Sequence, residues 1–485
     1  MTTHKLTSCI LAVTAFAWTQ SAAAVGLPDV ANAHTGKQLN SKSNLTDALK
    51  SGKPDLMLRL RYEDVDDSIP ASSALAGTGS ADLLSIRTKL GYSSARFHGF
   101  YTRLEFEANT RIGDDNAFNI DEDFTFPPGP AGSRIAEGHA IIPDNDFEEF
   151  NEAYIGWRSA TSGCPNSPEG CNGATTVKLG RQTIIYDNHR WVGNIVWRQN
   201  HQSYDAIRID NTSVSKLGIS YTYLDKVNRT FGPDSPFKEF QMDNSHLINV
   251  SYQFPMGKLI GYGYLLDFED NPLTPFTEGV GAIGTPGLAN FDSDTWGVRF
   301  VGKHSMSGGT ALLYELEFAN QDPSNDAGPT LSDNNYYNIE FGSAFKLAGK
   351  PVVVKVGHEV LEGNGVNSLQ TPLATVHAFN GWADKFVGAP GGTATPAGGL
   401  EDTSLTVVVK GLAGPSKLVL QYHDYSANTT IGGVSDYGDE WGVLFAKPFP
   451  KNWLVLAKYA SFSDGGDGFS FDTEKFWLMA QFQFK

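Results

Sequence analysis

The segment from Gly180 to Ala206 holds the side chains best suited to recognise a ligand or another part of the protein. Its sequence, GRQTIIYDNHRWVGNIVWRQNHQSYDA, starts and ends like a β-strand, but its middle part has no period. Trp191 and Trp197 lie there among arginine, asparagine and glutamine residues. Guanidinium groups bind carboxylates through two oxygens at once, so these arginines suit an anionic ligand or carboxylates of the protein itself. We expect the segment to pack against a wall.

The chain around this segment alternates apolar and polar residues with period two, which is typical of β-strands. In DLMLRLRYE, for example, Leu58 and Leu60 fall on one face and Arg59 and Arg61 on the other. A soluble β-sandwich alternates in the same way. Here, however, the polar faces repeatedly carry long charged side chains, and the apolar faces end in aromatic residues. These features favour a membrane barrel with a wet lumen.

The lengths of the connections support the same fold. We count about eighteen strands. Their lengths are close to the roughly 9–11 residues that a barrel strand needs to cross a bilayer. Links after odd-numbered strands are long, as at 110–150 and 362–400, and links after even-numbered strands are short, as at 255–257. The link 159–174 is the exception. The expected fold class is all-β: a single transmembrane antiparallel β-barrel of about 18 strands, with long extracellular loops and short periplasmic turns.

The start of the chain predicts export. Residues 1–24 read as a signal peptide, with a basic start, a short apolar stretch and an Ala-Ala-Ala cleavage site. Residues 25–54 are expected to form a periplasmic segment in which NLTDALKSG makes a short helix, and residues 55–485 the barrel. The expected location is the outer membrane of a Gram-negative bacterium. In such an oxidising compartment, Cys164 and Cys171 are expected to form a disulfide; a redox or metal pair is the alternative.

Composition and motifs exclude other classes. The formal net charge of −17 argues against nucleic acid as a partner. The sequence contains no GxSxG, HExxH or Walker motif, so we expect no enzyme activity and no cofactor. The expected partners are membrane lipid and lipopolysaccharide. Acidic runs in the outer loop 110–150 are candidates for cation bridges to lipopolysaccharide phosphates, although such runs are more often solvated loop.

By this strand count, 187–203 joins the fifth and sixth strands and is the third outer loop. In general porins this loop folds into the lumen, and we predict the same here. The constriction would be formed by Trp191, Asn194, Trp197 and Gln199. The two tryptophans would pack against the inner wall, and the polar side chains would hydrogen-bond to wall residues: Asn188, Asn194, Arg198, Gln199 and Asn200. Arg190 and Arg198 would then face the channel beside Arg181 and Arg208 of the flanking strands. In the alternative, the loop folds on itself at the barrel top, and Asp187 and Asp205 pair with its arginines.

Three stretches carry a resemblance to a known family. The Gly180–Ala206 segment, YLDKVNRTFG, and GHEVLEGNG with QTPLATVHAFNGWADKF together resemble the alginate-export family of bacterial outer-membrane porins. The resemblance runs from Leu56 to Phe484. It implies an eighteen-stranded monomeric barrel with an arginine-lined passage for an anionic polysaccharide. The matching candidates on the lumen side are Arg59, Arg61, Arg87, Lys89, Arg103, Arg181, Arg208 and Arg299.

A second candidate loop contains HAFNGWADKF, within 362–400. Its candidate gate residues are His377, Asn380, Trp382 and Asp384. Asp384 and Asn380 have oxygen ligands that suit Ca²⁺. The favoured alternative is a loop anchored by Trp382 and Phe386 that packs on its neighbours, so we expect no metal.

The function expected from these residues is passive diffusion of anionic or polar saccharides, such as uronate chains. Closely spaced arginines would bind a carboxylated chain weakly enough for it to leave again. The alternatives are a general or cation-preferring nutrient porin, a structural barrel with a filled lumen, and a soluble secreted β-protein. A cation-preferring channel would use the carboxylates that share the lumen side: Glu105, Glu107, Glu315, Glu317 and Glu340.

Overall fold

The computed structural model describes most of the chain. The described residues are 41–68, 79–113, 140, 142–159, 174–235, 237–269, 292–324, 331–387 and 395–484. The expected signal peptide, the expected Cys164–Cys171 disulfide and the acidic runs between 114 and 123 lie outside these residues.

Eighteen antiparallel strands form one closed sheet, because β1 pairs with β18 as well as with β2. The strands are β1 (Lys53–Asp67), β2 (Ser80–Ser93), β3 (Phe100–Arg111), β4 (Phe147–Arg158), β5 (Thr175–Gln182), β6 (Ser203–Asn211), β7 (Leu217–Asn228), β8 (Glu239–Gln253), β9 (Gly257–Leu266), β10 (Asp292–Ser305), β11 (Ala311–Ser324), β12 (Asn334–Leu347), β13 (Lys350–Leu361), β14 (Leu400–Lys410), β15 (Lys417–Ile431), β16 (Val434–Phe449), β17 (Trp453–Ser463) and β18 (Thr473–Phe484). The predicted all-β barrel is confirmed.

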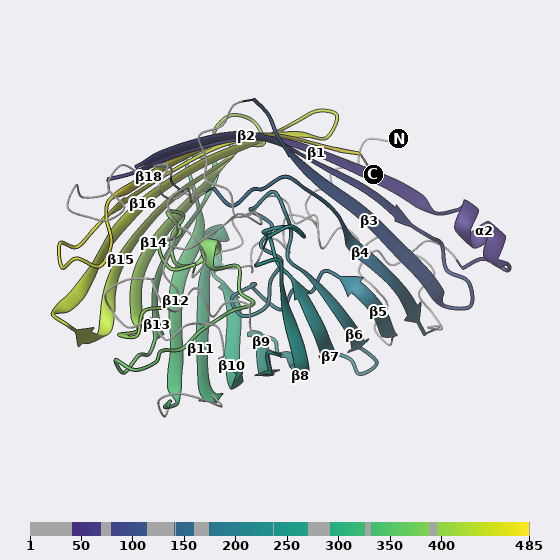
Figure 1. Ribbon diagram of the computed structural model, residues 1–485, viewed down its shortest axis with the longest axis horizontal. Helices are drawn as coiled ribbons and strands as arrows, with labels where there is room; N and C mark the ends of the chain where they lie inside the picture. The colour runs from purple at the N-terminus through teal and green to yellow at the C-terminus, as the bar shows by residue number, and fades with distance from the viewer. Residues whose placement is uncertain are drawn as a thin grey trace.

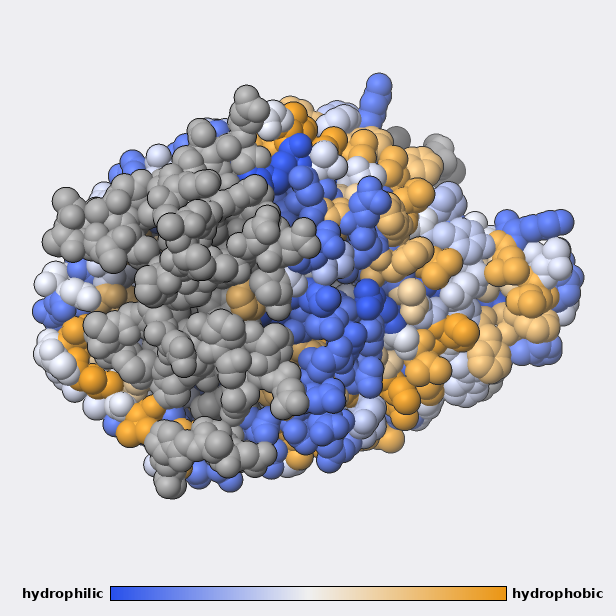
Figure 2. Space-filling view, in the orientation of Figure 1, coloured by the Kyte–Doolittle hydropathy of each residue, from blue (hydrophilic) through white to orange (hydrophobic). Residues whose placement is uncertain are grey.

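Alternation along each strand separates an apolar outside from a polar inside. In β1, Arg59 and Arg61 are 0% and 1% exposed, whereas Leu60 between them is 43% exposed. Large apolar side chains are exposed in the same way on other strands, for example Leu90, Ile155 and Phe341. On the face shown in Figure 2, apolar side chains gather towards the right of the view and hydrophilic ones border them. The outside therefore suits a hydrocarbon environment, and the charged side chains point inward.

The connections differ in length between the two ends of the barrel, which we call the long-loop end and the short-turn end. At the short-turn end, β8 and β9 are joined by 254–256, and β12 and β13 by 348–349. The link 159–174 is the long exception there, as expected. The prediction that every other pair follows this rule is wrong for β15 and β16, which only Gly432 and Gly433 join at the long-loop end. Both glycines have positive φ, at 62° and 92°, which a tight two-residue hairpin turn requires.

A short helix, α2 (Leu45–Lys50), precedes the barrel at the position where the sequence predicts one. The Oδ1 atom of Asn44 caps it by accepting a hydrogen bond from the backbone N–H of Asp47 over 2.8 Å. Ala48 is buried, and its carbonyl accepts from the backbone N–H of Ala95 over 3.0 Å. The helix thus packs on the turn between β2 and β3, at the edge of the barrel (Figure 1). In the described ranges, no helix has the length and apolarity to cross a membrane.

Two long segments fold inward from the long-loop end. The first inner loop, residues 183–202, joins β5 to β6. The second inner loop, described over residues 362–387, leaves β13 and contains the short 3-10 helix η7 (Val376–Ala378). (A second 3-10 turn, η6 (Ser307–Gly309), lies at the short-turn end between β10 and β11.) Figure 1 shows both inner loops within the curved wall of strands. Their side chains, and not a sheet-on-sheet core, fill much of the interior.

Candidate functional site

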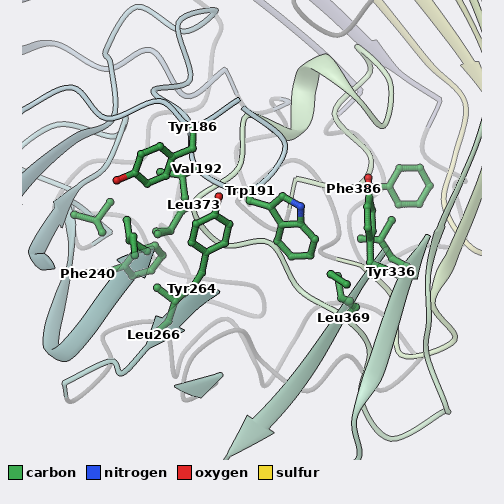
Figure 3. Close-up of a cluster of buried hydrophobic side chains, with 14 of the residues drawn as sticks. Tyr186, Trp191, Val192, Phe240, Tyr264, Leu266, Tyr336, Leu369, Leu373 and Phe386 are labelled. Carbon is green, nitrogen blue, oxygen red and sulfur yellow. The ribbon is translucent and has the colours of Figure 1, made fainter. Parts of the chain in front are cut away.

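Trp191 anchors the first inner loop to the wall formed by β9, β11 and β12. Its ring is 8% exposed and lies 5.6 Å from Tyr262 and 5.1 Å from Tyr336, centroid to centroid. Figure 3 shows Trp191 between Tyr264 and Tyr336. The indole Nε1–H donates to Glu317 Oε1 over 2.8 Å. Trp191 is therefore held by apolar packing and by one polar contact, as aromatic anchors usually are.

Trp197 anchors the same loop to the opposite wall. Its ring stacks on His377 of the second inner loop at 5.2 Å and meets Trp477 of β18 edge-on at 5.6 Å. The Lys458 ammonium lies 3.9 Å from the ring centroid, and the Arg61 guanidinium 4.8 Å. Two cations over one ring give a favourable cation–π environment in a site from which water is excluded.

Backbone carbonyls of the first inner loop take up the arginines of the β1–β2 wall. Arg61 donates to the carbonyl of Trp197 over 2.6 Å. Arg59 and Arg87 both donate to the carbonyl of Arg198, over 3.2 and 3.3 Å. All three arginine side chains are buried. The wall arginines thus hold the loop inside the barrel, because they donate to carbonyl oxygens that would otherwise need other partners.

Carboxylates of the lumen side pair with the candidate cations. The closest carboxylate partners are Glu63 for Arg61, Glu107 for Arg87, Glu105 for Lys89, Asp55, Glu105 and Glu152 for Arg103, Asp205 for Arg181, Asp210 for Arg208 and Glu315 for Arg299. The sequence interpretation had these cations free to bind a ligand, whereas the structure places most of them in ion pairs. Arg59 is the exception, because it donates to Gln481 and to loop carbonyls. Arg181 alternates with the inward Gln182 and shares its face of β5 with the exposed Leu179, so its expected lumen-side position is not confirmed. Burying a guanidinium costs several kcal/mol unless a carboxylate compensates it, and here the same strand or a nearby one supplies that carboxylate.

The polar side chains of the first inner loop mostly reach the wall, as predicted. Gln199 donates to Ser85 over 2.9 Å, Asn200 to Glu149 over 2.6 Å, and Asn188 to Glu315 over 3.3 Å. Asn194 is the exception. It is fully buried, yet its side-chain amide has no hydrogen-bond partner among the described residues. The predicted hydrogen bond of the Asn194 side chain to the wall is therefore not made among the described residues.

Asp384 joins the two inner loops to each other and to the wall. Its carboxylate accepts from Arg198 of the first inner loop over 2.7 Å and from Lys475 of β18 over 3.1 Å. His377 contacts its other oxygen, with Nδ1 to Oδ1 at 2.5 Å. Burial opposes the negative charge, but the donors His377, Lys475 and Arg198 lower the pKa of Asp384 well below its usual value. We call Arg198, Asp384, His377 and Lys475 the latch.

His377 is uncharged in this arrangement. Burial lowers the pKa of His377 to about 3; the nearby Lys458 adds to this effect, and Asp384 opposes it. Lys458 Nζ lies 2.5 Å from Nε2 of the ring. Because an ammonium can only donate, Nε2 accepts and the ring proton is on Nδ1, facing Asp384.

A second set of contacts ties the loops together nearer to β13. Arg190 donates to Glu359 over 2.6 Å and to Thr371 over 3.0 Å, while Asn380 donates to the other Glu359 oxygen over 2.6 Å. Burial opposes the charge, yet Glu359 raises the pKa of Arg190 above its usual value. Arg190 and Arg198 were both expected to face an open channel; instead they face carboxylates, since both inner loops occupy that space.

The two candidate Ca²⁺ ligands, Asn380 and Asp384, contact different partners. Asn380 contacts Glu359 and Arg190, whereas Asp384 is surrounded by cations. Among the described residues, no group of three or more His, Cys, Asp or Glu side chains is placed to hold a metal. Trp382 anchors the loop, as the favoured alternative holds: its backbone N–H and that of Ala383 donate to Glu440 of β16.

Sequence reasoning missed several residues that complete the site. Glu359, Glu440, Lys458 and Lys475 each occupy a polar position of an alternating strand, so their inward direction was readable from the sequence. Their partners were not, because those partners come from the loops. Arg229, which follows β7, carried no signal beyond its place in YLDKVNRTFG.

Comparisons with known proteins support the fold. The chain matches no protein-family profile and no curated protein. It is similar in structure to OccAB4 of Acinetobacter baumannii, with a TM-score of 0.63, 13% identity, and coverage of 89% of this chain and 98% of that one. For OccK9 (OpdG) of Pseudomonas aeruginosa the TM-score is 0.60, with 14% identity and coverage of 90% and 99%. For OpdK of the same organism, solved with vanillate, it is 0.61, with 12% identity and coverage of 90% and 99%.

These matches define the class of fold. The chain is an 18-stranded β-barrel of the outer-membrane kind, similar in architecture to the Occ proteins, one of which is described as an outer membrane protein. No family profile matches the chain, so the resemblance to the alginate-export family is not confirmed.

Proposed function

We propose that the protein is an outer-membrane channel for passive diffusion of small anionic solutes whose charge is carried by carboxylates. The observation that carries this proposal is the interior of the barrel. Its wall is rich in guanidinium and ammonium groups, and the two inner loops narrow its lumen. The wall from β17 through β3 alone contributes Lys458, Lys475, Arg59, Arg61, Arg87, Lys89 and Arg103. A closed barrel with an apolar outside and a charged, loop-narrowed inside is the architecture of a selective pore.

Solute size follows from how tightly the loops are docked. Arg59 and Arg87 are fully buried behind the first inner loop. The ion pair between Arg198 and Asp384 joins this loop to the second inner loop. A small carboxylate needs a modest opening, whereas a uronate chain of the kind expected from the sequence needs both loops to move. We therefore place small carboxylates first and oligouronates second. The likeness to OpdK, which was solved with vanillate, supports a carboxylated solute.

The same burial favours a second candidate, a barrel whose lumen is filled. The first inner loop joins both walls at once, through Trp191 on one side and Trp197 on the other. If this docking is permanent, the barrel conducts nothing and serves as a scaffold.

Bilayer recordings separate these candidates. The purified full chain is inserted into planar bilayers, and single-channel current and reversal potential are measured across a KCl gradient. A channel for anions gives discrete current steps and a reversal potential with the sign of the chloride equilibrium potential. Added benzoate or galacturonate blocks its current. A cation-selective reversal potential contradicts the proposed selectivity, and a folded protein without current supports the filled barrel.

A further inference from the structure

A pocket lies where the two inner loops meet the loop that joins β7 to β8. Its charged and titratable lining consists of Arg198, Arg229, His377, Asp384 and Lys475. Its apolar lining includes Pro143, Phe231, Phe240, Pro372 and Phe386. Five segments far apart in the sequence thus contribute side chains to one pocket, because Pro143 precedes β4 and Lys475 belongs to β18.

The charges of this lining do not balance. Arg198, Arg229 and Lys475 are cations, and Asp384 is the one carboxylate that faces them in the described lining. Arg198 and Lys475 share that carboxylate, at 2.7 and 3.1 Å, and Arg198 has a second carboxylate partner outside the lining, Glu63, at 3.3 Å. His377 adds no positive charge at neutral pH, because burial holds its pKa near 3. The pocket therefore has an excess of positive charge in a place with little water to screen it.

Arg229 carries this excess. Its guanidinium lies 4.7 Å from the ring centroid of Phe231 and 4.3 Å from that of Phe240. Both rings are buried. Within the described part of the chain, the guanidinium forms no ion pair and no side-chain hydrogen bond, unlike Arg190, which has Glu359. Burial alone lowers the pKa of Arg229 to about 9, so the group is still charged at neutral pH.

Three other polar side chains of the pocket, those of Gln202, Gln370 and Thr371, are already engaged. Gln202 donates to Tyr204 over 2.7 Å, and Gln370 donates to Ser368 over 2.7 Å. The Thr371 hydroxyl accepts from Arg190. A ligand with many hydroxyl groups would find few free partners here, and an unpaired buried hydroxyl is unfavourable. The phenylalanine and proline walls instead suit a flat apolar body.

We propose that this pocket is a binding site for a monocarboxylate carried on a flat apolar ring, with Arg229 holding the carboxylate. The guanidinium fork binds both carboxylate oxygens, and Phe231 and Phe240 keep it oriented towards the pocket. The ring of the ligand contacts Phe386 and the proline side chains. This inference deepens the proposed channel function, on which it rests for the route of the ligand, by assigning a site and a ligand class.

The test uses the full chain in detergent and benzoate as the probe, with benzamide as its uncharged analogue. Binding is followed by saturation-transfer NMR, and variants are Arg229→Ala, Arg229→Lys and Lys238→Ala. Lys238 is exposed in the same loop, so its substitution removes one positive charge without touching the pocket. Folding of each variant is checked by the heat-dependent shift of the barrel band on gels.

The expected result is a Kd for benzoate about tenfold higher in Arg229→Ala, from loss of a charge-assisted bond, with a smaller rise in Arg229→Lys. Lys238→Ala binds like the natural protein, and benzamide binds weakly to all. Equal benzoate affinity in the natural protein and Arg229→Ala, with both folded, overturns the site. Binding in detergent without bilayer current keeps the site and overturns the channel; current without binding does the reverse.

Discussion

Arg198 and Asp384, 186 residues apart in the chain, are joined by a 2.7 Å contact inside the barrel. One belongs to the first inner loop and the other to the second, so neither loop can leave the lumen without breaking this contact. Arg198 also contacts Glu63 of β1, at 3.3 Å. Burial opposes the charge, but Glu63 and Asp384 raise the pKa of Arg198 above its usual value. The latch thus joins both inner loops to the wall.

Breaking the latch is expected to open the barrel. Arg198→Ala leaves Asp384 and Glu63 with one donor fewer, and removing one partner of a buried pair costs about 3–5 kcal/mol. We expect larger and noisier single-channel currents in planar bilayers. The control is Lys226→Ala, because Lys226 and Glu239 form a 3.1 Å pair with both side chains about a quarter exposed, 23% and 26%. Unchanged current in Arg198→Ala means that the loops do not close the pore.

Acid is expected to weaken the same contacts. The pKa of His377 is about 3 in the docked loop, below the usual value of about 6.5, so the undocked loop binds a proton that the docked loop does not. Docking is therefore unaffected above pH 6.5 and weakens as the pH falls, by about 2 kcal/mol at pH 5. The lowered pKa of Asp384 acts in the same direction at still lower pH. Single-channel conductance should therefore rise as the pH is lowered from 7 to 5.

The matched variant for this prediction is His377→Gln, which keeps a neutral polar side chain. Its conductance should be the same at pH 7 and pH 5. If the natural protein shows the pH dependence and His377→Gln shows it equally, the response comes from another group.

The direction in which a side chain points from its strand was predictable from the sequence, but the partner of that side chain was not. Period two decides which face of a strand a residue occupies, so Arg59 and Arg61 could be placed in the lumen correctly. Partners depend on where a loop goes after it leaves the sheet. Arg190 and Glu359 are 169 residues apart, and no local pattern links them. The interpretation of free arginines failed because it placed each cation without its neighbours.

The limits of β15 and β16 were also missed, for a local reason. The polar run SANTTIGGVSD, residues 426–436, reads from the sequence as a loop after an odd-numbered strand, although its two central glycines make a tight turn. The register shifts near Ser426 disturb the alternation that would have marked the strands. A solvated strand end beyond the membrane needs no apolar face, so hydropathy alone does not identify it.

Docking of the first inner loop is expected to depend on Trp197. Trp197→Ala removes a ring that contacts His377, Trp477 and two cations, and a buried tryptophan of this kind contributes about 3–5 kcal/mol. We expect trypsin to cleave after Arg190 or Arg198 in this variant and not in the natural protein. Trp441→Ala is the control, because Trp441 is 57% exposed on the outer face. Equal resistance of both variants would show that the loop is held without Trp197.

Lys178 and Arg208 lie directly opposite each other on β5 and β6, both with inward side chains. Like charges at paired positions destabilise a sheet by roughly 0.2–1 kcal/mol. Arg208 has Asp210 at 2.9 Å, but in the described residues Lys178 has no ion pair; its ammonium lies 4.7 Å from the centroid of Tyr154. We expect Lys178→Gln to raise the temperature at which the barrel band shifts on gels, and to lower the anion preference measured by reversal potential. A gain in stability with unchanged selectivity would place Lys178 away from the path of the solute. A loss of stability would show that its contact with Tyr154 outweighs the repulsion from Arg208.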